Sequence, residues 1–97
     1  MITAGDVYLA DLKDERRRRV LVISNDRFHR VAGRALVAPE IIAEPDEVSF
    51  PWRVQVDGTM YAVDMVRSLP AKRLLDRTGR APAAAMEAVR RALLNIT

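Results

Sequence analysis

Apolar and polar positions in the first forty residues follow the short-period patterns of β-strands. Residues 6–12 alternate and are rich in strand-forming side chains, which predicts a first strand. Residues 20–24 form a continuous apolar, β-branched run of the length expected for a buried central strand. Residues 25–30 fit a short helical turn, and residues 34–39 fit a third strand that Pro39 ends.

The middle of the chain combines a loop with a hairpin pattern. Residues 40–50 carry a proline and clustered acids, which predicts a loop. Residues 40–42 are also compatible with a short strand inside this loop. Residues 52–56 alternate between apolar and polar side chains. Asp57-Gly58 is a strong two-residue turn signal that leads into a further strand over 59–66. The pattern therefore predicts a β-hairpin centred on this dipeptide.

Helix-like spacing begins toward the C-terminus. Residues 70–79 fit a short helix, with Pro70 in its first turn and Gly79 as its terminator. Residues 81–96 fit a longer helix, because their apolar side chains fall on one stripe. About five strands followed by two helices predict an α+β fold: a small, strongly bent antiparallel sheet or partly open β-barrel with C-terminal helices on one side. A chain of 97 residues has room for a single domain over 1–97.

The composition limits the kinds of site the chain can form. It has no cysteine and one histidine, so disulfides are excluded and a zinc cluster has too few ligands. We therefore expect no metal and no cofactor. No stretch approaches the roughly 18 apolar residues of a membrane span, and the N-terminus lacks a basic segment before a long apolar one. We expect a cytoplasmic protein with no membrane association.

Positive charge is concentrated in one short stretch. The chain carries 16 lysines and arginines against 13 aspartates and glutamates, a net charge of +3. Residues 13–34 hold eight basic and three acidic side chains, whereas residues 40–57 hold five acidic and one basic. Residues 16–19 are four consecutive arginines directly before the predicted central strand. They form either a solvated turn with Asp14 and Glu15 as counter-charges or a surface that binds a polyanion.

Several motifs occur in a characteristic order along nearly the whole chain. They are "GDVYLADL", "RRVLVISND", "ALVAP", "FPWRVQVDG", "VDMVRSL" and "KRL", followed by a terminal helix. This order resembles the MazF/PemK/Kid family of toxin endoribonucleases from bacterial type II toxin–antitoxin modules. The resemblance implies an SH3-like barrel that forms a homodimer. It also implies metal-independent, sequence-specific cleavage of single-stranded RNA (mRNA) by attack of the ribose 2′-hydroxyl, and inhibition by a cognate antitoxin.

The same resemblance implies a set of site residues. The family's catalytic arginine corresponds to Arg18, whose planar guanidinium suits the charged phosphorane. The family's catalytic threonine corresponds to Ile41, so Ser24 is the candidate hydroxyl in its place. The remaining candidates are expected to bind RNA: Arg16, Arg17, Arg19, Asn25, Trp52, Arg53, Asp64 and Arg67.

Most of these residues also have a purely structural interpretation. Ser24 and Asn25 are typical helix caps, and Trp52 is typical of a core or dimer contact. The two charged residues of "VDMVRS" are equally consistent with an ordinary surface ion pair. His29, on a helical turn among arginines, is interpreted as a solvated surface residue.

A second class of function stays open from the sequence. Ile41 cannot donate a hydrogen bond to a phosphate, and the negative charge of Glu40 beside it repels one. The alternative is a non-catalytic MazF-like or CcdB-like toxin that binds a protein target such as gyrase, or an inactive member that retains antitoxin binding. The gyrase-binding mode uses a tryptophan near the end of the terminal helix, and "RRALLNIT" has none.

Overall fold

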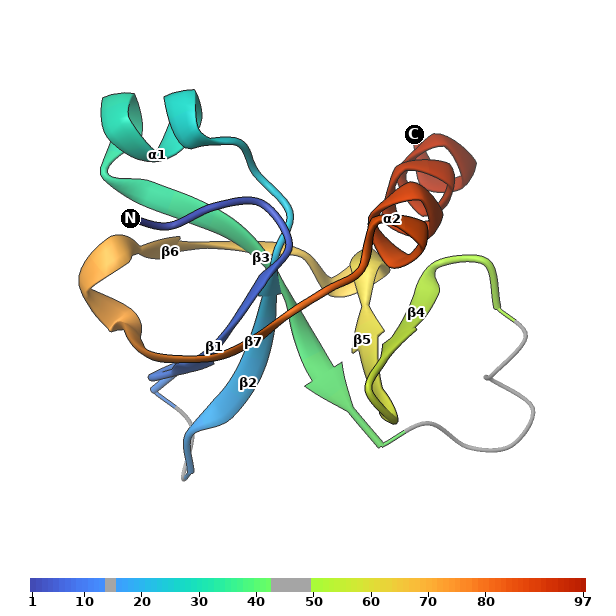
Figure 1. Cartoon of the computed structure of the whole chain (residues 1–97), viewed down its shortest axis with the longest axis horizontal. Coiled ribbons are helices and arrows are strands. Elements are labelled where there is room, and N and C mark those ends of the chain that lie inside the picture. Colours follow the sequence, from blue (N-terminus) through green and yellow to red (C-terminus); the bar gives the residue numbers. More distant parts are fainter. Residues whose placement is uncertain (14–15, 43–49) are drawn as a thin grey trace.

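Strands and helices of the chain are arranged around one curled antiparallel sheet (Figure 1). The computed structural model describes residues 1–13, 16–42 and 50–97. The strands within these ranges are β1 (Asp6–Ala10), β2 (Arg18–Val22), β3 (Arg34–Ile41), β4 (Arg53–Val56), β5 (Thr59–Ala62), β6 (Arg67–Pro70) and β7 (Leu74–Arg80). The helices are α1 (Asp26–Ala32) and α2 (Ala83–Ile96), with short 3-10 turns η2 (Val63–Met65) and η3 (Ala71–Arg73).

The long strand β3 organises the sheet. The strand order is β4-β5-β3-β2-β1-β7, and β6 pairs with β3 outside this path. The first half of β3 pairs with β6, from Arg34 to Val37, and its end pairs with β5 at Glu40 and Ile41. Pro39 lies at this change of partner, where the ladder on that edge is interrupted and a missing N–H costs least. The strand therefore continues past Pro39, and the prediction that it ends there is wrong.

Successive side chains of β2 point to opposite faces of the sheet and pack into two separate hydrophobic cores. Leu21 packs on one face with Ala38 and with the stripe of α2, which includes Val89. Val20 and Val22 point to the other face and join the second core. Because both faces of β2 are covered, its sequence is a continuous apolar run rather than an alternating one. The predicted buried central strand is confirmed.

The hairpin and the first helix also follow their local signals. Asp57 and Gly58 both have positive φ, 50° and 78°, as a tight two-residue turn requires between strongly twisted strands. Asn25 begins α1 by accepting a hydrogen bond from the Phe28 N–H at 2.9 Å. Gly33 ends α1 in the left-handed conformation, φ 66°.

The predicted short helix over 70–79 is wrong. These residues form the end of β6, the turn η3 and most of β7, which pairs with the outer edge of β1 (Figure 1). Gly79 lies opposite Val7 in this ladder rather than terminating a helix. The predicted strand over 59–66 is likewise divided, because η2 separates β5 from β6. The described residues therefore contain seven strands rather than about five, and one C-terminal α-helix rather than two.

Asp6 accounts for the pairing of β7 with β1. Its side chain is 3% exposed and accepts hydrogen bonds from Arg80 Nη1 at 2.8 Å and Arg77 Nε at 3.1 Å. It also accepts one from the Thr3 N–H at 3.0 Å. A buried carboxylate is stable only with such partners. Pairing with β1 and the ion pairs to Asp6 therefore stabilise β7 as a strand, although the spacing of residues 70–79 favours a helix.

Asp6→Asn should lower the free energy of unfolding by about 2 kcal/mol, because it removes a buried charge that two half-exposed guanidiniums share. Urea denaturation followed by circular dichroism measures the change. Asp76→Asn, at an exposed aspartate on β7, is the matched control and should change stability by less than about 0.5 kcal/mol. Equal effects of the two substitutions would contradict this account of β7.

Candidate functional site

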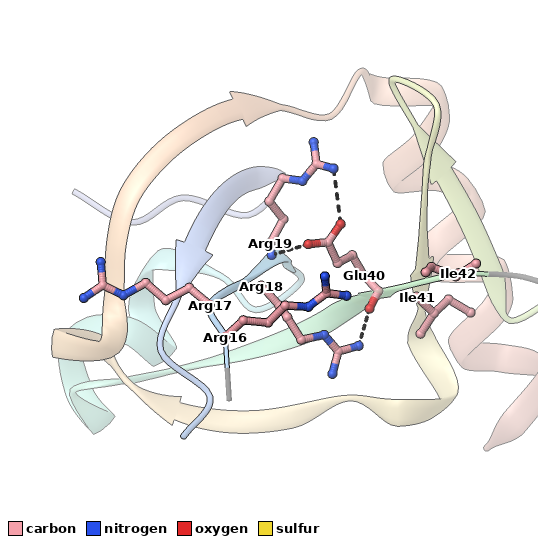
Figure 2. A pocket seen from close by; sticks show the side chains of 7 residues that line it. All are labelled: Arg16, Arg17, Arg18, Arg19, Glu40, Ile41 and Ile42. Atoms are coloured by element: carbon pink, nitrogen blue, oxygen red, sulfur yellow. Dashed lines mark hydrogen bonds and ion pairs between the residues drawn. The ribbon is translucent and has the colours of Figure 1, made fainter. Parts of the chain in front are cut away.

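The arginine run forms one wall of a pocket at the start of β2 and the end of β3 (Figure 2). The pocket has a volume of about 480 Å³. We call it the arginine pocket, and its lining residues are Arg16, Arg17, Arg18, Arg19, Glu40, Ile41 and Ile42. Four guanidinium groups and one carboxylate give this lining a net charge of +3, which favours an anionic ligand.

Strand pairing brings the two halves of the arginine pocket together. Val20 lies opposite Pro39 in the β2–β3 ladder, so the residues before Val20 run beside those after Pro39. The backbone N–H of Arg19 donates to Glu40 Oε1 at 2.8 Å, and Arg19 Nη2 donates to Oε2 at 3.2 Å. The Arg18 guanidinium donates to the backbone carbonyl of Glu40.

The four arginines do not share one direction. Alternation along a strand sends Arg18 and Arg19 to opposite sides of β2, and Figure 2 shows their side chains reaching Glu40 from opposite sides. The Arg16 side chain also points toward the Glu40 strand, whereas that of Arg17 points away from it (Figure 2). Three of the four arginines therefore converge on the end of β3.

The surface hollow continues from the arginine pocket to the β4–β5 hairpin. A second pocket of about 400 Å³ shares Arg19, Glu40, Ile41 and Ile42 with it and adds Gln55, Gly58, Thr59 and Met60. A small neighbouring pocket is bordered by Tyr61, which lies opposite Glu40 in the β3–β5 ladder. Burial raises the pKa of the Tyr61 hydroxyl. The negative charges of Glu40 and Asp57 raise this pKa further, and the positive charge of Arg19 lowers it by less than burial raises it. Tyr61 is therefore a neutral O–H group at physiological pH.

The structure does not bring Ser24 to the arginine pocket. Ser24 lies beyond the opposite end of β2 from Arg18, about 20 Å away at the usual rise per strand residue. Its Oγ lies 2.7 Å from His29 Nε2 and accepts the Leu36 N–H at 2.9 Å. His29 Nδ1 lies 2.9 Å from the Ile2 carbonyl oxygen. The interpretation of His29 as a solvated residue is wrong, because it is 9% exposed and links α1 to the N-terminal segment.

The other predicted RNA-binding residues lie outside the lining of the arginine pocket. Asn25 caps α1. The Trp52 side chain packs against the first core, with its ring 5.3 Å from that of Phe50. The Arg53 side chain is 7% exposed and forms an ion pair with Asp64 at 3.5 Å. Arg67 is exposed on β6.

Glu40 is a site residue that sequence reasoning misses. Its charge alone suggests only repulsion toward phosphate, whereas in the folded chain its side chain holds Arg19. The available signal is the strand order: an antiparallel return from the third predicted strand places residues just after Pro39 beside those just before Val20.

Metal ligands and membrane-spanning helices are both missing from the described residues. Within residues 1–13, 16–42 and 50–97, no group of three or more histidine, aspartate or glutamate side chains is placed to hold a metal ion. No helix in this described part of the chain has the length and apolar character needed to cross a membrane.

The family model for the PemK-like, MazF-like toxin of type II toxin–antitoxin systems matches residues 3–97. The chain belongs to this family. The match covers nearly the whole sequence, including the arginine pocket and the terminal helix of this PemK/MazF-like protein. No curated protein sequence matches the chain significantly.

Solved structures share the fold of this PemK/MazF-like chain. An endoribonuclease in complex with its cognate antitoxin, from a Mycobacterial species, has a TM-score of 0.85 at 20% identity and covers 98% of this chain and 93% of its own. A MazE-MazF complex from Deinococcus radiodurans has a TM-score of 0.80 at 23% identity, covering 98% and 93%. The Mycobacterium tuberculosis toxin MazF-mt6 has a TM-score of 0.77 at 20% identity, covering 93% of each chain. The predicted α+β fold is confirmed.

Ser24→Ala should lower the free energy of unfolding by about 1 to 3 kcal/mol, because it leaves the Leu36 N–H and a nitrogen of buried His29 without their hydrogen-bond partner. Thermal denaturation measures the loss. Ser68→Ala, at a serine that accepts an exposed hydrogen bond from Arg34, is the control and should cost less. A Ser24→Ala protein with unchanged stability but no activity would instead assign the hydroxyl to the chemistry.

Proposed function

We propose that this PemK/MazF-like chain is the toxin of a toxin–antitoxin pair and acts in the cytoplasm as a metal-independent endoribonuclease on single-stranded RNA. The observation that carries the proposal is the convergence of Arg16, Arg18 and Arg19 at the end of β3 (Figure 2). RNA is a polyanion, and its phosphates are the ligand class that a group of guanidiniums binds best.

Arg18 is the main phosphate-contacting residue in this proposal. A guanidinium stays charged at every physiological pH and presents two N–H groups that match two phosphate oxygens. When the ribose 2′-hydroxyl attacks the adjacent phosphate, negative charge grows on those oxygens. A guanidinium already positioned there stabilises the transition state more than the ground state. The backbone carbonyl of Glu40 fixes the direction of Arg18 before substrate arrives.

The proposed partners follow from the same set of relatives. One of the similar structures is named as an endoribonuclease in complex with its cognate antitoxin, and another as a MazE-MazF complex. We propose that this chain likewise forms a homodimer and is inhibited by a cognate antitoxin. An antitoxin segment rich in acidic side chains suits the arginine pocket, because the pocket lining carries net positive charge.

A protein-binding toxin without nuclease activity is the second candidate. Ile41 and Ile42 form the wall of the arginine pocket opposite the arginines, and Ile42 is 88% exposed. Exposed apolar side chains beside a charged pocket are suited to a protein partner as well as to RNA bases. This candidate covers both a CcdB-like inhibitor of a protein target and an inactive member that retains antitoxin binding.

Incubation of the purified protein with a long mixed-sequence RNA should give discrete cuts that persist in EDTA, with new ends mapped by primer extension. Arg18→Ala should lower the cleavage rate by about 10² to 10³, the usual effect of removing one transition-state donor. Arg90→Ala, on the exposed side of α2, is the control and should cleave like the wild type. A folded wild-type protein that leaves every RNA intact would favour the protein-binding candidate.

Arg16→Ala should reduce the salt dependence of RNA binding. Each phosphate contact to a single strand contributes about 0.7 to the slope of log K against log salt concentration, so removing one cation should lower the slope by about that amount. Fluorescence anisotropy over a series of salt concentrations measures it, again with Arg90→Ala as the control. An unchanged slope would place the RNA backbone away from the arginine pocket.

A further inference from the structure

Glu40 is the one side chain in the described lining of the arginine pocket that has a basic atom able to take a proton from a substrate. The other lining side chains are four guanidiniums, which are permanently charged donors, and two isoleucines, which have no polar atom. Cleavage of RNA by its own 2′-hydroxyl needs a group that removes the hydroxyl proton. The lining therefore offers a single candidate for that step.

The structure holds the Glu40 carboxylate firmly while leaving part of it free. The side chain is 27% exposed. Arg19 donates to both oxygens, through its backbone N–H and through Nη2. A carboxylate has about four lone-pair positions, so the two bonds from Arg19 leave acceptor capacity for a further donor. The pairing of Glu40 with Tyr61 on β5 fixes the backbone beneath it.

We propose that Glu40 is the general base of the cleavage reaction, an inference that rests on the proposed function. Glu40 takes the proton of the ribose 2′-hydroxyl, and the 2′ oxygen forms a bond to phosphorus. The bond from phosphorus to the 5′ oxygen breaks, and its electron pair leaves on that oxygen. The 5′ oxygen takes a proton from water, and the resulting hydroxide takes the proton from Glu40. The products are a 2′,3′-cyclic phosphate end and a 5′-hydroxyl end.

The surrounding charges make this role consistent with phosphate binding. A carboxylate alone repels a phosphate. Here Arg16 and Arg18 approach Glu40 from one side and Arg19 binds it from the other (Figure 2). The guanidiniums neutralise the phosphate as it enters, so the carboxylate acts on the neighbouring 2′-hydroxyl rather than on the phosphate itself. The arginines thus stabilise charge, and Glu40 removes the proton.

The test is Glu40→Gln, because glutamine keeps the size of the side chain and an oxygen that accepts the Arg19 N–H. The substrate is an oligoribonucleotide that contains a cleavage site mapped with the wild-type protein. We expect kcat/KM to fall by about 10² to 10⁴. We also expect loss of the acidic limb of the wild-type pH profile, in which the rate falls roughly tenfold per pH unit because the base becomes protonated.

Binding and stability separate catalysis from structure. The binding probe is the same oligonucleotide with a 2′-deoxyribose at the cleaved position, which the protein binds but does not cut. Glu40→Gln should bind this probe within a few-fold of the wild type and lower the midpoint of thermal denaturation only slightly, because its ion pair with Arg19 is partly exposed. Glu40→Asp keeps a carboxylate and should retain the acidic limb at a reduced rate. Glu87→Gln, on an exposed face of α2, is the matched control and should leave all four readouts unchanged.

Several results would overturn the assignment. Equal or faster cleavage by Glu40→Gln would mean that the carboxylate only competes with phosphate for the arginines. An acidic limb that survives in Glu40→Gln would place the base elsewhere. Loss of probe binding in parallel with loss of cleavage would mean that Glu40 supports binding rather than proton removal. A wild-type protein that does not cut RNA would remove the proposed function and this inference together, whereas an active Glu40→Gln protein removes the inference alone.

Discussion

The antiparallel pairing of β2 with β3 is the interaction on which the rest of the structure depends. Its register, with Val20 opposite Pro39, places the first residues of β2 beside the last residues of β3. A shift by a single residue would exchange the two faces of β2 and move Leu21 out of its core. The apolar alternation therefore fixes the register, and the register assembles the arginine pocket. The pairing of β2 with β3 therefore both stabilises the fold and positions the residues of the site.

The arginine pocket holds four positive charges close together with limited electrostatic repulsion between them. Four adjacent guanidiniums repel one another, and water screens them because their wall is open to solvent. Glu40 neutralises part of this repulsion through Arg19, and its backbone carbonyl accepts from Arg18. The same residue that stabilises the empty pocket is thus close to any phosphate that enters it. A bound anion adds further neutralisation of the arginines.

Packed cores and hydrogen bonds support the strands that carry the pocket. The two cores hold both faces of β2 and β3. At the far end, the hydrogen bonds of Ser24 and His29 tie α1 and the N-terminal segment to β3. A buried histidine and a partly buried serine that are hydrogen-bonded in this way favour one arrangement over its alternatives. The hydroxyl that the sequence offers for chemistry is instead part of this support.

Local signals in the sequence determined much of the architecture. The buried run of β2, the Asp57-Gly58 hairpin, the cap at Asn25 and the stripe of α2 each depend on residues close in the chain, so pattern and propensity suffice to predict them. The density of positive charge at residues 16–19 is likewise visible in the sequence alone. Only the tertiary structure decided that residues 74–80 form a strand, that Ser24 lies far from Arg18, and that Glu40 meets Arg19. Those outcomes depend on contacts between residues distant in sequence, such as Asp6 with Arg80. Local propensity carries no information about which distant partner satisfies a buried charge or an open strand edge.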